Sequence, residues 1–129
     1  MLDTNVLISA LLFPSKKFDS IMEYIFTEHE LVLSSYVVDE LKRAVRRKFP
    51  QKEADIERLL FLMSFEYVYT PDEIDRKLFV IRDVKDYPVL YTAIIEDVDV
   101  LITGDKDFTD IVLEKPEIVT PTEFVERYL

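Results

Sequence analysis

The stretch Val100-Leu101-Ile102-Thr103-Gly104-Asp105-Lys106-Asp107-Phe108 decides how the rest of this sequence is interpreted. It opens with a short apolar run, which is typical of a buried strand. The run ends near the only glycine of the chain, Gly104, and two carboxylates, Asp105 and Asp107, follow. Ligands bind at the carboxyl ends of strands in open α/β sheets. The stretch therefore predicts a strand that delivers acids to a site, although Asp105 or Asp107 alone would also suit as a helix cap.

Short apolar segments alternate with amphipathic helices along the remaining chain. This alternation predicts an α/β fold, with βα units around a parallel sheet. Right-handed crossovers place helices on both faces of such a sheet. The segments predicted as strands or strand stubs are 1–3, 30–33, 67–69, 100–102 and 117–119, and the predicted helices are 5–12, 18–26, 36–48, 53–65, 74–81, 88–96 and 124–128.

Two segments have nearly the same sequence, and each is typical of a helix start: Thr70-Pro71-Asp72-Glu73 and Thr120-Pro121-Thr122-Glu123. Each places Thr at the cap, Pro at the first helical position and Glu at the third, which is a capping box with the preferred proline. Both are structural signals, and they predict that a helix begins at each place.

Composition limits the class of protein. A chain of 129 residues is expected to form one domain with one core. No apolar run approaches the length needed to span a membrane, the N-terminus has no signal-peptide pattern, and the lack of cysteine agrees with a reducing cytoplasm. The formal net charge of −10 is the opposite of the basic excess usual in nucleic-acid binders. Either the partners are not polyanions, or cations neutralise concentrated acids; a basic protein partner would also suit.

Four acids follow apolar segments at comparable places, namely Asp3, Glu40, Asp86 and Asp105. A parallel sheet gathers strand ends and helix starts along one edge, so the four are expected to converge. At about 4 Å a pair of like charges costs roughly 4 kcal/mol at an effective dielectric near 20, so such a cluster needs protons or cations. The one histidine, His29, lies by the second predicted strand, away from these acids and most simply on the surface. Oxygen ligands alone favour Mg²⁺ or Mn²⁺ over zinc, and such ions suit hydrolysis of a phosphate ester.

Two of these assignments have a neighbouring competitor. Asp39 adjoins Glu40, but one helical position changes direction by about 100°, and Glu40 borders the apolar stripe more closely. Asp83 lies three residues before Asp86. We prefer Asp86 because it directly precedes the helix predicted at 88–96.

Four segments, in order, resemble the motifs of the PIN-domain (PilT N-terminus) family, and the resemblance runs over essentially the whole chain. The segments are Leu2-Asp3-Thr4-Asn5-Val6-Leu7-Ile8-Ser9, Ser34-Ser35 with Val38-Asp39-Glu40-Leu41, Asp86-Tyr87-Pro88-Val89-Leu90-Tyr91-Thr92-Ala93, and Leu101-Ile102-Thr103-Gly104-Asp105-Lys106-Asp107-Phe108.

This resemblance implies a three-layer α/β/α sandwich with a central parallel sheet of about five strands, formed by a single PIN-like domain over residues 1–129. It implies a Mg²⁺- or Mn²⁺-dependent endoribonuclease. The chain is similar in length to VapC-type toxins, so a cognate antitoxin and a homodimer are also expected. The implied catalytic and metal-binding residues are Asp3, Glu40, Asp86 and Asp105, with Asn5, Thr103 and Asp107 in support.

One feature departs from the family pattern. Only Met1 and Leu2 precede Asp3, whereas family members have a longer apolar run that forms the central strand. Either the native chain begins upstream of Met1, or this strand is a stub with its charged amine near the site.

Substrate contacts are less sharply indicated. Lys85 and Lys106 flank the acids and are placed to meet a phosphate, while Tyr87 and Tyr91 are equally suited to base stacking and to the core. The basic run on the 36–48 helix suits an RNA backbone, but a solvated helix face is the more common explanation.

Two other functions compete with the nuclease. A PIN scaffold with little or no activity would serve as a binding protein in an antitoxin or RNA-processing complex. A phosphatase of small phosphoesters would need an Asp-x-Asp nucleophile, a form that Asp105-Lys106-Asp107 has.

Overall fold

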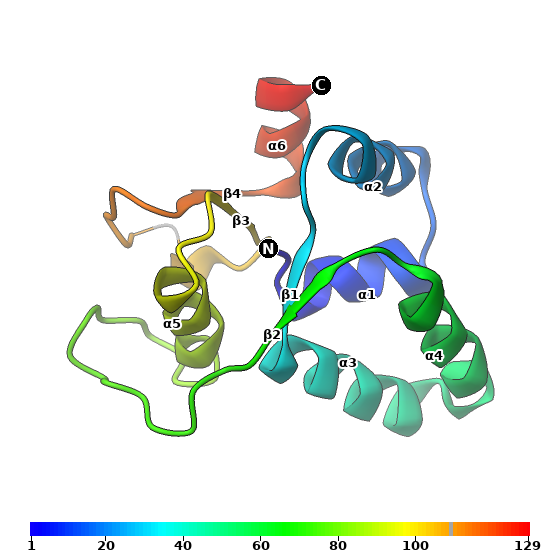
Figure 1. The fold of residues 1–129 in the computed structure, drawn as a ribbon, viewed down its shortest axis with the longest axis horizontal. Coiled ribbons are helices and arrows are strands. Elements are labelled where there is room, and N and C mark those ends of the chain that lie inside the picture. The colour runs from blue at the N-terminus through cyan, green and yellow to red at the C-terminus, as the bar shows by residue number, and fades with distance from the viewer. Residues whose placement is uncertain (109) are drawn as a thin grey trace.

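The structure is a computed structural model, and it describes residues 1–108 and 110–129. The strands run through the middle of the molecule, with α5 on one side and α1, α3 and α4 on the other (Figure 1). This arrangement confirms the α/β class. The elements are α1 (Thr4–Leu12), α2 (Lys16–Glu28), β1 (Val32–Ser34), α3 (Ser35–Lys48), η1 (Pro50–Lys52), α4 (Glu53–Leu62), β2 (Glu66–Val68), α5 (Tyr87–Ile95), β3 (Val100–Ile102), η2 (Lys106–Phe108), β4 (Glu117–Val119) and α6 (Pro121–Tyr128).

The strands are short, and all of their pairings in the described residues are parallel. β1 pairs with β2, and β3 pairs with β4. Leu2 adds a parallel bridge to Ile102, supported by hydrogen bonds from the Asp3 N–H to the Ile102 carbonyl (3.0 Å) and from the Ile102 N–H to the Met1 carbonyl (2.9 Å). The five expected segments are therefore present, but their hydrogen bonds form two groups instead of one continuous sheet.

The N-terminal stub is fixed by burial as well as by this bridge. Leu2 is fully buried, as are Leu33 of β1 and Leu101 of β3, so the segments share one core. The Met1 amine donates to the Val100 carbonyl at 2.8 Å. The amine thus lies at the start of β3, whereas Asp3 lies at its end. The amine therefore donates to the backbone at the start of β3 instead of to an acid of the site, and the acid whose charge acts on it is Asp99.

The helix predicted over 74–81 does not form. The chain from Tyr69 to Asp86 makes only turns and bends. Thr70 cannot act as a cap there, since its N–H donates to Ser35 Oγ (2.9 Å) and its hydroxyl pairs with Thr92 Oγ1 (2.9 Å). Phe79 instead stacks on Tyr87, with 4.1 Å between ring centroids.

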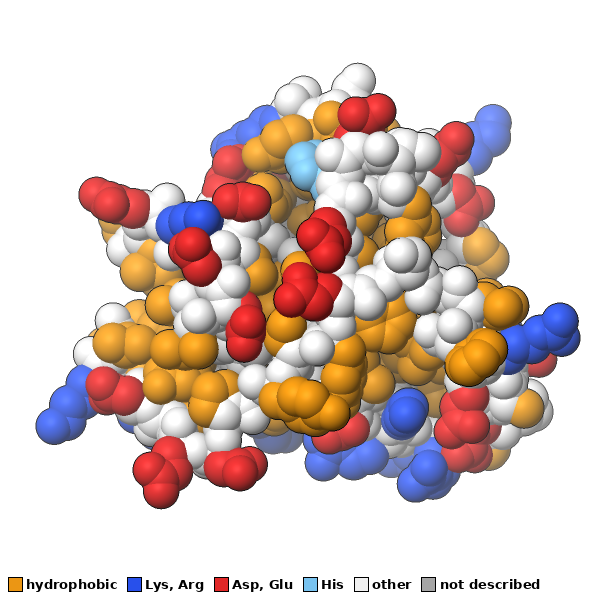
Figure 2. All heavy atoms as spheres, viewed as in Figure 1, with side chains coloured by type: hydrophobic (Ala, Val, Ile, Leu, Met, Phe, Trp, Pro, Cys, Tyr) orange, Lys and Arg blue, Asp and Glu red, His pale blue; other side chains and the backbone are white. Residues whose placement is uncertain are grey.

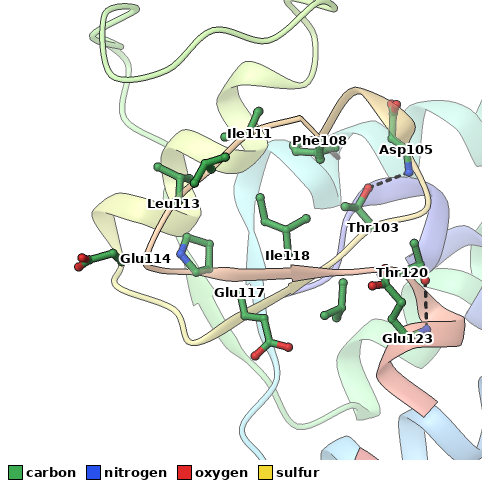
Figure 3. Close-up of a pocket in the computed structure, with 13 residues that line it drawn as sticks. Thr103, Asp105, Phe108, Ile111, Leu113, Glu114, Glu117, Ile118, Thr120 and Glu123 are labelled. Atoms are coloured by element: carbon green, nitrogen blue, oxygen red, sulfur yellow. Dashed lines mark hydrogen bonds between the residues drawn. The ribbon is translucent and has the colours of Figure 1, made fainter. Parts of the chain in front are cut away.

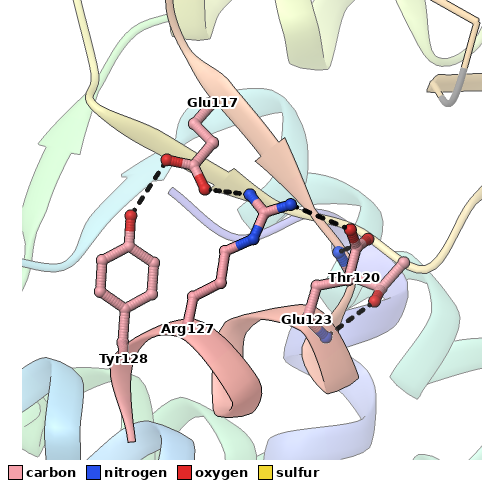
Figure 4. A network of polar contacts seen from close by, with 5 residues as sticks. All are labelled: Glu117, Thr120, Glu123, Arg127 and Tyr128. Atoms are coloured by element: carbon pink, nitrogen blue, oxygen red, sulfur yellow. Dashed lines mark hydrogen bonds and ion pairs between the residues drawn. The ribbon is translucent and has the colours of Figure 1, made fainter.

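The second capping box forms as predicted. Thr120 Oγ1 accepts from the Glu123 N–H (3.1 Å), and Glu123 accepts from the Thr120 N–H (3.0 Å). Arg127 pairs with both Glu123 and Glu117, and Glu117 also accepts from the Tyr128 hydroxyl (Figure 4). These contacts tie the start of β4 to α6.

On the face seen in Figure 2, acidic side chains are widely spread. Several basic side chains lie along its lower edge, where α3 lies, and others stand at its upper and side edges. No helix within the described residues is long and apolar enough to cross a membrane.

Candidate active site

Asp3 stands at the end of the N-terminal stub and is buried. One carboxylate oxygen accepts from the Thr103 hydroxyl (2.7 Å), and the other accepts from the Thr4 N–H (2.7 Å) at the start of α1. Asp3 is therefore also the N-cap of α1, so capping and site membership are compatible. Burial raises the pKa of Asp3, and the charge of Asp105 adds to the rise, although the two hydrogen bonds oppose it.

Asp105 follows β3 and is joined to Asp3 through Thr103. Its N–H donates to Thr103 Oγ1 (3.1 Å), the same oxygen whose hydrogen goes to Asp3. Asp105 Oδ1 in turn accepts from the Asp107 N–H (2.9 Å) at η2. One threonine thus fixes two acids that are 102 positions apart in the sequence.

Asp86 precedes α5 but makes no capping hydrogen bond with its side chain. Its Oδ2 is buried and has no partner among the described residues. Burial raises the pKa of Asp86 to about 7, and close contact with Asp105 and repulsion from Asp105, Asp3 and Asp83 contribute. Two ionised carboxylates offer only acceptors to each other, so the contact between Asp86 and Asp105 requires a shared proton or a cation.

Glu40 joins the site through Thr4, whose hydroxyl donates to Glu40 Oε1 at 2.6 Å. The competitor Asp39 is exposed and lies on the side of Tyr67. Burial raises the pKa of Tyr67, and the charge of Asp39 contributes to the rise. Glu40, not Asp39, therefore faces the helix that Asp3 caps. From the sequence, Thr4 is only an alternative to Asp3 as the cap of the first helix, and its contact with Glu40 is not predicted, although it directly follows Asp3 in the first motif.

Asp83 and Asp107 form a second acidic group around Asp86. One carboxylate oxygen from each of these three residues lies within 4.8 Å of the others. Asp107 also pairs with Arg82, at 2.6 Å between Nη2 and Oδ1. From the sequence, Asp83 competes with Asp86 and is otherwise expected either to support the site or to be solvated. Arg82 is not predicted, although it directly precedes Asp83.

The remaining predicted residues lie at the margin. Asn5 is exposed on the first turn of α1, and Lys106 is exposed in η2. Lys85 is exposed too, and its carbonyl accepts from the Tyr36 hydroxyl (3.0 Å). Burial raises the pKa of Tyr36, and the charges of Glu40, Asp86 and Asp83 contribute. Tyr36 therefore lies beside the acids from α3 and from the segment before α5.

The suggestion that Tyr87 and Tyr91 stack on a base is not supported. Both are buried. Tyr87 lies between Phe79 and Tyr91 in a stack of rings, and Arg76 covers it at 5.2 Å from the ring centroid. These tyrosines therefore belong to the core.

The geometry gathers Asp3, Asp86 and Asp105 into one electrostatically linked group, with Glu40 attached through Thr4. All potential ligand atoms are oxygens, which suits Mg²⁺ or Mn²⁺. The buried Asp86 Oδ2 supplies a structural reason for a cation, since it lacks a protein partner.

Comparisons with known proteins agree with the fold. A family model described as PIN domain matches residues 1–107. The crystal structure of VapBC2 from Rickettsia felis bound to a DNA fragment from their promoter contains a similar chain, with a TM-score of 0.69 and 21% sequence identity over 92% of this chain and 95% of that one. No curated protein matches the sequence.

Proposed function

This chain belongs to the PIN-domain family, and from that premise we propose that it is a metal-dependent endoribonuclease that hydrolyses RNA phosphodiester bonds. One observation carries the proposal. Acids from three distant parts of the chain meet: the Thr103 hydroxyl oxygen joins Asp3 and Asp105, and Asp86 lies against Asp105, where burial and then these neighbouring charges raise the pKa of Asp86 to about 7. Carboxylates that are held together despite their repulsion, with a strongly perturbed pKa, are typical of a functional site.

A Mg²⁺ or Mn²⁺ ion fits the residues present. Asp3, Glu40, Asp86 and Asp105 would hold it, directly or through water, and the oxygens of Asp83 and Asp107 extend the acidic group on one side. When bound, such an ion activates a water molecule and neutralises charge on the phosphate.

Other roles in the reaction fall to side chains of the protein, which orient the acids, exchange a proton and meet the substrate. Thr103 and Thr4 hold Asp3 and Glu40 in orientation through their hydroxyls. Asp86 exchanges a proton near neutral pH, so it can release one as a cation enters and hold one when the site is empty. Lys85 and Lys106 lie at the margin, where a flanking phosphate of the RNA would pass.

The partner that we propose is a cognate antitoxin, which would make this chain the toxin of a toxin–antitoxin pair. The structural neighbour comes from a VapBC complex, and the net charge of −10 suits a basic partner segment. We also propose a homodimer, because α4 exposes Phe61 (88%) and Leu62 (66%), and exposed apolar patches often mark interfaces between chains.

The test is cleavage of structured and unstructured RNA with Mg²⁺, Mn²⁺ or EDTA, run beside Asp105→Asn. We expect cleavage with either ion, none with EDTA, and a loss of at least 10³-fold in the variant, as when a catalytic group is removed. Circular dichroism checks that the variant is folded. Equal cleavage by wild type and variant would overturn the proposal.

A protein that binds antitoxin but cleaves no RNA under any of these conditions would instead be the binding scaffold considered above. Phosphate transfer onto Asp105, trapped as a covalent adduct, would favour the phosphatase. The phosphatase is the less expected outcome, since acids from four separate segments gather here and suit a cation site, whereas a phosphatase of this kind needs only the pair Asp105 and Asp107.

A further inference from the structure

An aromatic stripe lies along β2. Its three members, Phe65, Tyr67 and Tyr69, occupy alternate positions, which places their side chains on one face of the strand. Val68, which lies between them, is buried. Successive ring centroids are 6.5 and 5.1 Å apart, and Tyr67 is 40% exposed and Tyr69 74% exposed. The aromatic stripe therefore presents ring surface to solvent, and most of it lies toward the carboxyl end of the strand.

Basic side chains are concentrated on the neighbouring helix α3. Five of the 16 Lys and Arg residues of the chain fall within positions 42–48, and all five are exposed. Arg46 pairs with Glu53 at 3.1 Å, whereas Arg43 has no ion pair among the residues that the structure describes. In a chain with a net charge of −10, α3 is therefore a place where a polyanion is attracted and where the basic segment of an antitoxin is repelled.

The aromatic stripe is joined to the basic helix. Directly after the stripe, the Thr70 N–H donates to Ser35 Oγ at the first residue of α3 (2.9 Å). Tyr67 lies beside Asp39 of the same helix, and burial and then the charge of Asp39 raise the pKa of Tyr67. Arg43 follows Asp39 by four positions, a spacing that makes two side chains neighbours on a helix. Aromatic and basic side chains thus share one continuous surface.

This surface continues to the acid site. Arg43 follows Glu40 by three positions, so these side chains are also neighbours. Tyr36 lies at the same place, since burial and the charge of Glu40 raise its pKa while the charge of Arg43 opposes the rise. The Tyr36 hydroxyl donates to the carbonyl of Lys85 (3.0 Å), which directly precedes Asp86. A chain molecule bound along the surface therefore reaches the acids.

The pocket beside Asp105 is a poorer place for a strand of RNA. It has a volume of about 500 Å³ and lies between β4 and the loop over 110–116 (Figure 3). None of the described residues that line it is a Lys or an Arg. The carboxylates of Glu114 and Asp105 point away from it (Figure 3). The pocket therefore offers no cation to a phosphate, whereas α3 does.

We propose that the aromatic stripe and the basic face of α3 bind a single-stranded segment of the RNA substrate and lead it to the acids. The inference rests on the proposed function. Bases stack on Tyr67 and Tyr69, as in other sites for single strands, and Arg43 contacts a phosphate. A duplex cannot use the stripe, because its base faces already stack on one another.

The first test measures stacking. A short fluorescent oligo(rU) is titrated with the full chain in EDTA, in which no cleavage is expected. Tyr69→Ala should bind about tenfold more weakly than wild type, which is equivalent to ~1.4 kcal/mol, whereas Tyr69→Phe keeps the ring and should bind like wild type. A short RNA duplex should bind weakly and equally to all three. Equal affinity of wild type and Tyr69→Ala for oligo(rU), or an equal loss in both variants, would overturn the inference.

The second test measures the phosphate contact through its dependence on salt. Arg43→Gln should weaken binding of oligo(rU) and reduce the slope of log Kd against log KCl concentration by about 0.7, the value for one phosphate contact with a single strand. Lys16→Gln is the matched control, since it removes one exposed positive charge at the start of α2 and should leave the slope nearly unchanged. Tyr69→Ala should lower the affinity without changing the slope. Identical slopes for Arg43→Gln and Lys16→Gln would contradict the proposed contact.

Cleavage with Mn²⁺ separates this inference from the proposed function. If Asp105→Asn loses cleavage and Tyr69→Ala raises KM with little change in kcat, both stand. If Asp105→Asn loses cleavage but folded Tyr69→Ala and Arg43→Gln bind and cleave RNA like wild type, only the RNA-binding surface fails. If Asp105→Asn cleaves normally while the two surface variants bind RNA weakly, the nuclease site fails and the surface stands.

The molecular mass in solution tests the competing occupant, a second copy of the chain. Light scattering of wild type and Tyr69→Ala should give the same mass, because the aromatic stripe is assigned to RNA. A lower mass for Tyr69→Ala, together with an unchanged affinity for RNA, would assign the stripe to a contact between copies and overturn the inference.

Discussion

The acid site has two halves that are built differently. In the strand half, Asp3 and Asp105 stand at strand ends, and Thr103 joins them with hydrogen bonds of 2.7 and 3.1 Å. In the loop half, Asp83 and Asp86 come from a segment without helix or strand, and Asp86 Oδ2 has no partner among the described residues. Each carboxylate of the strand half accepts at least one hydrogen bond from the protein, whereas a buried oxygen of Asp86 in the loop half lacks a protein partner that a proton or a cation would supply.

The two halves are therefore expected to differ in what they control, the strand half acting on stability and the loop half on the binding of a ligand. Buried acceptors with hydrogen bonds support the fold, and losing one donor leaves an acceptor unsatisfied. An unpartnered carboxylate destabilises the ionised form and is relieved by a cation. We therefore expect changes in the strand half to lower both stability and activity, and changes in the loop half to act on cation and proton binding.

The largest effect is expected for Thr103→Val, which keeps the shape but removes the hydroxyl shared by Asp3 and Asp105. We expect a loss of about 2 kcal/mol in the free energy of unfolding and a roughly 10- to 100-fold loss of RNA cleavage. Urea denaturation and cleavage rates measure these. Asp83→Asn is the loop-half counterpart and should leave stability nearly unchanged, because Asp83 is exposed. Equal destabilisation by both changes would remove the distinction between the halves.

A smaller effect is expected when the two Thr-Pro boxes are compared. Thr120→Ala removes a cap from α6 and should cost about 1 kcal/mol, as measured by thermal melting. Thr70→Ala removes no cap and only the hydrogen bond to Thr92, so its cost should be lower. A larger loss for Thr70→Ala would mean that the segment over 69–86 is more tightly held than its irregular backbone suggests.

The pH dependence of the metal-free protein probes Asp86. Its pKa is about 7 when folded and near 3.8 when unfolded, so the folded state binds more protons between these values. The free energy of unfolding should therefore fall as pH rises from about 4 to 7. In EDTA we expect the Tm of wild type to drop by a few degrees between pH 5 and pH 8, since ~1 kcal/mol corresponds to roughly 3–5 °C at this size. Asp86→Asn should show a smaller drop, and an identical drop would contradict the assignment.

The smallest effect concerns Arg82, which neutralises part of Asp107. Arg82→Gln removes an ion pair in which Arg82 is exposed and the Asp107 side chain is only 9% exposed. The affinity for Mn²⁺ should rise by about two- to fivefold, because an ion pair with a solvent-exposed partner contributes up to ~1 kcal/mol. Arg76→Gln is the control, since Arg76 lies in the same segment but covers Tyr87. Calorimetric titration measures both, and an equal response of the two variants would exclude a specific role for Arg82.

Sequence reasoning succeeded where local chemistry and packing agree. The strands 100–102 and 117–119 were predicted with the observed bounds, since apolar runs next to turn residues have few alternatives. It failed over 74–81, where a good capping motif was overridden by distant contacts. The Thr70 N–H is bound by Ser35 and the Thr70 hydroxyl by Thr92. No local sequence pattern reveals these two contacts, because both partners lie far from Thr70 in the sequence.

The residues of the site also fall into those that the local sequence predicts and those that depend on distant contacts. Asp3 and Asp105 follow from strand ends, and Glu40 and Asp86 from their places in the motifs. The bridging hydroxyl of Thr4 and the ion pair of Arg82 depend on side-chain directions between elements far apart in sequence, so spacing alone does not disclose them. The assignment of these acids to catalysis remains a prediction that activity measurements test.

The central claim is that acids from both halves hold one cation together. It is tested most directly by Mn²⁺ titration at pH 7.5, followed by electron paramagnetic resonance of free Mn²⁺, for wild type, Asp105→Asn and Asp86→Asn. The account predicts saturable binding by wild type and an at least tenfold weaker affinity in each variant, one from the strand half and one from the loop half. Binding that survives either substitution unchanged in a folded protein would contradict it.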